Sequence, residues 1–153
     1  MGYLWDSVRV KGGAYGVSCR LGRSTGNFVC TSYRDPNVSG TISAYDGIAD
    51  YLSGMSLNRE ELERAIVGAI GDLDLYMLPD ARGVKSLYQY LAGDTEEKRQ
   101  RMREEMLSTT ADDFRAFAGI MAEAKTHGAV SVIGGSRALE EGTRLGWKCE
   151  NLF

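Results

Sequence analysis

The sequence predicts an α+β domain in which helices pack on one face of an antiparallel sheet. Two β-rich runs, AYGVSCRL (residues 14–21) and NFVCTSY (27–33), are separated only by GRSTG, whose glycines and small polar residues suit a hairpin loop. Helical patterns follow, and the short apolar run AVSVIGG (129–135) reads as a buried strand. The order of these elements along the chain, two strands followed by a run of helices and a further strand, is typical of an α+β fold. Because no low-complexity linker or repeat interrupts the 153 residues, we expect a single domain over 1–153.

The first elements lead into the predicted hairpin. Residues 3–8 (YLWDSV) are expected to form a helix end. Its inward-facing residues are expected to be Leu4, Trp5 and Val8. Alternation then assigns one face of the first strand to Tyr15, Val17, Cys19 and Leu21. The second strand is expected to end at SYRDPN, because proline cannot continue a ladder and Asp-Pro-Asn favours a turn.

Apolar residues at helical spacing predict the elements that follow. The first such stripe consists of Ile42, Tyr45, Ile48, Ala49 and Leu52. Asn58 and Glu61 form a helix start signal ahead of an apolar stripe over 62–70, and a shorter stripe covers 84–91.

Three further helix starts are predicted from capping residues. Asp94 and Glu97 are expected to cap the helix EEKRQRMREEML, and Thr110 with Asp113 is expected to cap the next. Ser136 is expected to cap a final helical turn.

Composition excludes several classes of function. A net charge of -3 and a pI near 5.2 argue against a nucleic-acid partner, which requires a basic surface. The chain has no apolar run long enough for a membrane span and does not start like a signal peptide, so no membrane partner is expected. Three scattered cysteines without a CxxC indicate a reducing compartment. With His127 as the single histidine, we predict no metal site, and His127 before Gly128 is more typical of a helix end.

Three charged or glycine-containing motifs have ordinary structural explanations. The basic run KRQRMR (98–103) is flanked by glutamates and is typical of a solvated helix face. The acids Asp72, Asp74 and Asp80 surround a turn, where acids usually cap and form turns. VIGGS (132–136) could place a helix N-terminus against an anion, but it lacks the lysine of a P-loop, and a tight turn explains it equally well.

The stretch VRVKGGAYGV (8–17) is the strongest functional candidate. Gly12 and Gly13 allow backbone angles that other residues avoid, and they let another chain approach closely. Arg9 and Tyr15 place two strong hydrogen-bonding side chains at the edges of this bare segment. The alternative is a helix-to-strand corner with a buried Tyr15 and a surface Arg9, and the residues alone leave both open.

A family resemblance includes this stretch. YLWDSVRVKGGAYG, followed by SYRDPN, YDG and LERAIVGAIGDLD, resembles the carboxyl-terminal domain of the presequence-protease branch of the pitrilysin/insulinase zinc peptidases. PDARG, EEKRQRMREEML and DDFRAFA continue the likeness in the same order over nearly the whole chain. The resemblance implies a partial pitrilysin-type (LuxS/mitochondrial-processing-peptidase-like) metallohydrolase domain, a peptide substrate and a zinc-dependent oligopeptidase as parent.

The resemblance also implies roles for single residues. Arg9 and Tyr15 match an Arg-x5-Tyr element, so Arg9 would hold a substrate carbonyl and Tyr15 would stabilise the oxyanion of the scissile carbonyl. Gly12 and Gly13 would keep the wall low enough for a peptide to pass. The zinc motif His-x-x-Glu-His belongs to the family's amino-terminal domain. We therefore expect no cofactor in this chain, zinc in the parent's amino-terminal half, and no activity of the chain alone.

The chain departs from the family pattern in its length. A complete family domain is longer, so Met1 is expected to be an artificial start, and the missing strands would leave an unpaired sheet edge that favours self-association. The expected compartment is the bacterial cytoplasm or an organelle matrix. The alternative function is a non-catalytic structural or peptide-binding paralogue, which reading the upstream coding sequence for His-x-x-Glu-His would distinguish.

Overall fold

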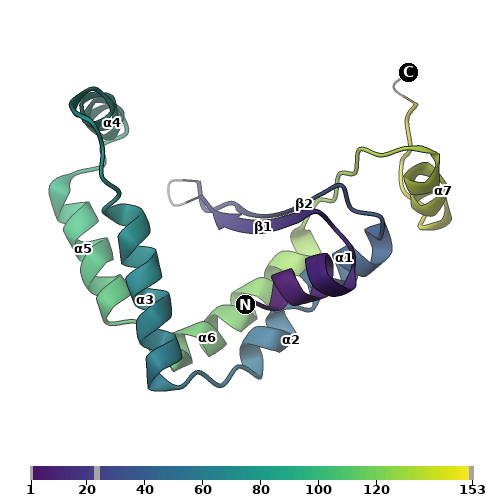
Figure 1. Cartoon of the computed structure of the whole chain (residues 1–153), viewed down its shortest axis with the longest axis horizontal. Coiled ribbons are helices and arrows are strands. Elements are labelled where there is room, and N and C mark those ends of the chain that lie inside the picture. Colours follow the sequence, from purple (N-terminus) through teal and green to yellow (C-terminus); the bar gives the residue numbers. More distant parts are fainter. Residues whose placement is uncertain (1, 23–24, 152–153) are drawn as a thin grey trace. The chain divides into compact units, whose positions relative to one another are not determined.

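The computed structural model describes residues 2–22 and 25–151 (Figure 1). The chain divides into two compact units, one formed by residues 1–54 with 116–153 and the other by residues 55–115. The α+β class is confirmed: the described residues are mostly helical and contain a two-stranded antiparallel sheet. The finer assignment to a pitrilysin-type domain, and the prediction of a single domain, stay predictions.

The predicted hairpin is confirmed in the first unit. Strand β1 (Gly16–Leu21) pairs with β2 (Phe28–Tyr33) in an antiparallel register. At the closed end, the Gly22 N–H donates to the Asn27 carbonyl oxygen over 2.8 Å. Two residues of the predicted GRSTG loop, 23 and 24, lie outside the described residues.

One face of the hairpin contacts helix α6 and the other is open. Phe28 contacts Phe117 of α6 (Ala111–His127) edge-on, with the ring centroids 6.3 Å apart. On the opposite face, the hydroxyls of Ser18 and Thr31 form an exposed hydrogen bond of 2.8 Å. Tyr15 precedes β1, so the expected alternation does not extend to it.

The core of this unit lies under the N-terminal π-helix η1 (Trp5–Lys11), which packs against α1 (Val38–Asp46). Val8 is only 1% exposed. The expectation that Trp5 faces inward is wrong: it is 36% exposed, and its ring packs against the Arg9 guanidinium of the same helix rather than in the core. The predicted stripe over 42–52 is helical and spans two helices, α1 and α2 (Ile48–Ser53).

The predicted third strand is wrong. Residues 129–135 form neither strand nor helix and are exposed, because no strand pairs with them along the described chain. A strand needs a hydrogen-bonded neighbour, which apolar composition alone does not supply. Helix α7 (Ser136–Arg144) follows, and its N-cap is Gly135 rather than the predicted Ser136, which is already the first helical residue.

The second unit is built from α3 (Arg59–Leu73), α4 (Pro79–Leu91) and α5 (Glu96–Leu107). The predicted Asn58–Glu61 capping box of α3 is present in both directions, with hydrogen bonds of 2.9 Å. For α5 the predicted cap is wrong by one residue. The Thr95 hydroxyl, not the Asp94 carboxylate, accepts a hydrogen bond from the Lys98 N–H. Thr95 is the residue whose side chain can reach the unpaired N–H groups of the first turn.

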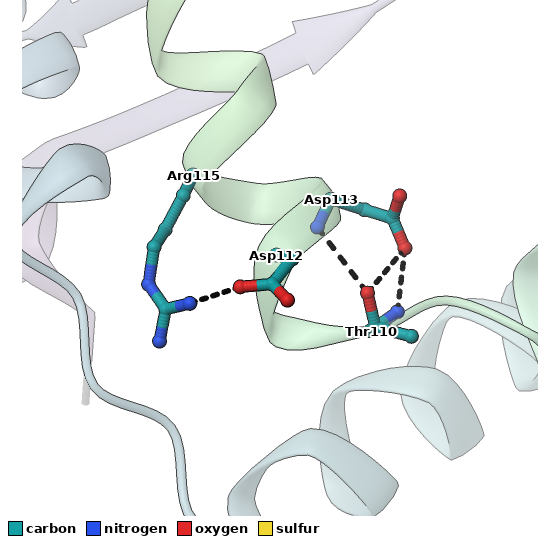
Figure 2. Close-up of polar contacts among 4 residues, drawn as sticks. All are labelled: Thr110, Asp112, Asp113 and Arg115. Carbon is teal, nitrogen blue, oxygen red and sulfur yellow. Dashed lines mark hydrogen bonds and ion pairs between the residues drawn. The ribbon is translucent and has the colours of Figure 1, made fainter.

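The predicted cap of α6 is confirmed (Figure 2). The Asp113 N–H donates to the Thr110 hydroxyl oxygen over 3.4 Å. In return, the Thr110 N–H and hydroxyl each donate to the Asp113 carboxylate over 2.7 Å. These bonds lower the pKa of Asp113 and hold the first turn closed. Asp112 forms an ion pair with Arg115 in the same turn.

Candidate functional site

The junction between η1 and β1 needs both of its glycines. The Gly13 N–H donates to the Arg9 carbonyl oxygen, and Gly13 has a positive φ of 81°. A Cβ on Gly12 would lie 2.6 Å from the Val8 carbonyl oxygen. The Ala14 N–H then donates to that same oxygen over 3.1 Å. The chain therefore leaves the helix through a tight corner that only glycines allow.

Tyr15 lies at the end of this corner with an exposed ring. Its N–H donates to the carbonyl oxygens of both Tyr33 and Arg34, over 3.1 and 3.3 Å, which fixes its backbone to β2. Its side chain is 65% exposed and meets the Tyr33 ring edge-on at 6.2 Å. The alternative of a buried tyrosine is therefore not what the structure contains.

Arg34 stands over both tyrosines. Its guanidinium carbon lies 5.9 Å from the Tyr15 ring centroid and 5.4 Å from that of Tyr33. Arg34 has a φ of 47°, a conformation that non-glycine residues rarely adopt and that is enriched at functional sites. The following turn holds it there, because the Asp35 carboxylate accepts the Asn37 N–H and the Thr41 hydroxyl.

Arg9 lies on η1 and contacts Trp5 rather than the tyrosines. Its guanidinium carbon is 4.0 Å from the centroid of a Trp5 ring, and the side chain is half-buried. Stacking of this kind uses the flat face of the guanidinium and leaves its N–H groups available in the plane. The structure thus groups Tyr15 with Tyr33 and Arg34, and Arg9 with Trp5.

The sequence predictions missed Tyr33 and Arg34 as members of this site. The motif SYRDPN contains both, but the sequence predicts only a turn there and a likeness to the family, with no role for either residue. The signal that points to them is their position where β2 ends, directly opposite the start of β1 at Gly16. Guanidiniums offer only hydrogen-bond donors and phenols can donate, so the cluster suits oxygen acceptors such as peptide carbonyls.

A groove of about 940 Å³ lies beside the end of β2. It is lined by residues 30–36, by residues of α1 and by residues 130–138, which include the VIGGS motif. The remaining charged motifs are paired as a solvated helix face predicts: Arg103 of KRQRMR makes a bidentate ion pair with Asp74, both bonds being 2.6 Å. This pair lowers the pKa of Asp74.

Residues 2–22 and 25–151 contain neither a cluster of metal ligands nor a membrane-spanning helix. No three His, Cys, Asp or Glu side chains lie together as a metal site requires. No helix in this part of the chain is both long and apolar enough to cross a bilayer.

Comparison with known proteins matches residues 1–136 to the family model described as the PreP C-terminal domain. The chain is 52% identical to presequence protease 1, chloroplastic/mitochondrial, of Arabidopsis thaliana over 116 residues, which are 76% of this chain and 11% of the relative. It is 34% identical to protein HypA of Clostridium perfringens over 143 residues, 94% of this chain and 15% of the relative. It is 36% identical to the mitochondrial presequence protease of Aspergillus oryzae over 111 residues, 72% of this chain and 10% of the relative.

Proposed function

The chain belongs to the PreP C-terminal domain family, and from this we propose that it is the carboxyl-terminal, non-zinc-binding part of a zinc-dependent oligopeptidase that degrades unstructured peptides. The chain spans only 10% to 15% of the length of the relatives compared above. Its proposed partners are therefore a peptide substrate and the amino-terminal half of the same enzyme. Two of these relatives are named as chloroplastic or mitochondrial proteins, and the third comes from a bacterium. These names support an organelle matrix or the bacterial cytoplasm as the proposed compartment.

Tyr15 is the residue we propose to act on the chemistry. Its exposed phenol, carried on a backbone that is hydrogen-bonded to β2, is the single observation that supports this role most directly. A fixed donor stabilises an oxyanion well because it needs no reorganisation as charge develops. In the proposal Tyr15 donates to the scissile carbonyl oxygen of the peptide.

Arg9, Gly12 and Gly13 are proposed to engage the substrate backbone. Arg9 would donate to a peptide carbonyl through the N–H groups that its stacking on Trp5 leaves available. The two glycines would keep the wall beside Tyr15 low. The tight corner also requires these two positions to lack a side chain, so the conformational role and the proposed role beside the substrate are compatible.

The described residues of this chain contain no cluster of side chains that could hold the zinc of the proposed enzyme. We propose that the amino-terminal half holds it. The isolated chain should bind less than a tenth of an equivalent of zinc and should not cleave a quenched peptide. Metal analysis after dialysis checks this, with His127→Ala as control. One tightly held zinc per chain, lost in His127→Ala, would contradict the proposal.

Substitution of Tyr15 in the complete enzyme tests the catalytic role. Tyr15→Phe removes one hydroxyl and keeps the ring, so we expect kcat to fall about a hundredfold, or ~3 kcal/mol, with an unchanged melting temperature. The matched control is Tyr90→Phe, which removes a hydroxyl from an exposed ring on α4, outside the cluster, and should leave kcat within a few-fold. Wild-type turnover in Tyr15→Phe would sink the role proposed for Tyr15.

Arg9→Lys in the same enzyme separates binding from chemistry. Lysine keeps the charge but loses the planar fork, so the KM should rise at least as much as kcat falls. If Tyr15→Phe and Arg9→Lys are both silent and no His-x-x-Glu-His lies upstream, the non-catalytic paralogue replaces the proposed enzyme.

A further inference from the structure

Two of the three cysteines face each other across the hairpin. Cys19 of β1 lies directly opposite Cys30 of β2 in the antiparallel register. The next pair along, Ser18 and Thr31, is joined by a hydroxyl hydrogen bond of 2.8 Å on the other face. The sheet therefore holds the two thiols at opposed positions on the same face.

The antiparallel register sets how close the two cysteine backbones are. Directly opposed residues of an antiparallel ladder have Cα atoms about 4.5 or about 5.5 Å apart, depending on whether their backbones are hydrogen-bonded to each other. Both spacings lie within the range that disulfides span, about 4.4 to 6.8 Å.

The two thiols differ in access. Cys19 is exposed, whereas Cys30 is half-buried on the face that contacts α6 through Phe28. Burial, with a smaller contribution from Cys19, raises the pKa of Cys30 to about 11. A soluble oxidant therefore meets Cys19 first, and Cys30 is the thiol that closes the bond.

We propose that Cys19 and Cys30 are a redox-modification site that a small-molecule disulfide, such as oxidised glutathione, converts into a cross-strand disulfide. The Cys19 thiolate attacks one sulfur of the oxidant, whose S–S bond breaks and releases one glutathione thiolate. The Cys30 thiolate then attacks the Cys19 sulfur and releases the second glutathione. Two protein thiols are oxidised, and one disulfide is reduced to two thiols.

Oxidation would tie together the strands that carry the tyrosine cluster. Tyr15 precedes β1 and Tyr33 ends β2, and the Cys19–Cys30 bond would cross between these strands near the middle of the ladder. The proposal does not rest on the proposed peptidase function, because it requires only the hairpin and its register. Either can fail without the other.

Thiol–disulfide equilibrium in the 153-residue chain tests the proposal. The chain is incubated at pH 8 in defined ratios of reduced to oxidised glutathione, quenched with acid and alkylated. Tryptic cleavage after Arg20 separates the two cysteines, so mass spectrometry detects a linked Cys19–Cys30 peptide pair. We expect this disulfide, and we expect its equilibrium constant to be at least tenfold larger in native buffer than in 6 M guanidinium chloride.

Two variants control for position. Cys149→Ser should leave the result unchanged. The double variant Cys30→Ala/Thr31→Cys moves the thiol by one residue to the other face of the hairpin, so it should lose the native preference while behaving like the wild type in denaturant. Equal constants in native buffer and denaturant for the wild type, or a Cys19 glutathione adduct that never closes, would overturn the proposal even if the double variant fails to fold.

Discussion

Gly12 and Gly13 are neighbours in the chain but are needed for different physical reasons. Gly13 has a φ of 81°, which costs any residue with a Cβ about 1 to 2 kcal/mol. Gly12 has an ordinary φ of −80°, but a Cβ there would meet a backbone oxygen at 2.6 Å. No side-chain rotation can relieve that contact, because the obstructing atom belongs to the main chain of η1.

Alanine substitutions at these glycines should therefore differ. We expect Gly13→Ala to lower the free energy of unfolding by about 1 to 2 kcal/mol and Gly12→Ala to lower it by at least as much. The matched control is Gly119→Ala in α6, where a Cβ meets nothing within 4 Å and should stabilise by about 0.5 to 1 kcal/mol. Urea unfolding of the three variants checks the order. A destabilising Gly119→Ala, or a silent Gly12→Ala, would contradict it.

At the scale of elements, most helices of the second unit begin with a side chain that closes the first turn. The reciprocal hydrogen bonds of Asn58 with Glu61 and of Thr110 with Asp113 satisfy N–H groups that have no partner inside the helix. Such caps are local, so they hold a helix start in place with little help from a buried core. This matters here because α3, α4 and α5 contain no fully buried residue among those described.

Removal of the Thr110 hydroxyl tests the α6 cap. Thr110→Ala should cost about 1 kcal/mol at neutral pH. Because the cap lowers the pKa of Asp113, its contribution is present above the ordinary carboxyl pKa and is lost as the pH falls through the lowered value. The difference between wild type and Thr110→Ala should therefore shrink in strong acid. Asp112→Asn, which breaks the exposed ion pair with Arg115, is the control and should cost about 0.5 kcal/mol or less. A gap that persists unchanged at low pH would contradict the account.

At the scale of the whole molecule, each unit leaves apolar surface uncovered. All the buried residues among those described lie in the first unit: Val8, Ala14, Thr41, Ile48, Ala118, Met121 and Gly142. In the second unit the predicted stripe of α4 is exposed, as Val84, Leu87, Tyr88 and Leu91 show. The hairpin of the first unit also has two strand edges, and the groove lies beside the end of β2. Unpaired edges and apolar patches of this kind favour association.

We therefore expect the isolated chain to self-associate at high micromolar concentration. Val29→Lys places a charge on the edge strand β2 and should shift sedimentation toward the monomer. Val67→Lys is the matched control: Val67 is 70% exposed on helix α3, compared with 49% for Val29, and lies on no sheet edge. A clean wild-type monomer without dye-accessible apolar surface would contradict this expectation, as would an equal effect of the two substitutions.

The sequence by itself determined the features that depend on neighbours close along the chain. The hairpin was predictable because alternating β-rich runs flank a glycine-containing loop, and two caps were predictable because a cap joins residues three positions apart. The ordered motifs also identified the family, which the match over residues 1–136 confirms. Arg9, Gly12, Gly13 and Tyr15 could be singled out from the same motifs, although their proposed roles stay predictions.

Only the tertiary structure decided what depends on distant partners. Residues 129–135 have the composition of a strand, but no strand among the described residues pairs with them, and composition cannot reveal that. Tyr15 continues an apolar alternation, yet it is exposed because its backbone bonds fix it where β2 ends, beside Tyr33 and Arg34. The facing thiols of Cys19 and Cys30 likewise follow from register, which pairing between strands sets. Burial, strand pairing and side-chain clustering are long-range properties, so they appear only when the chain is folded.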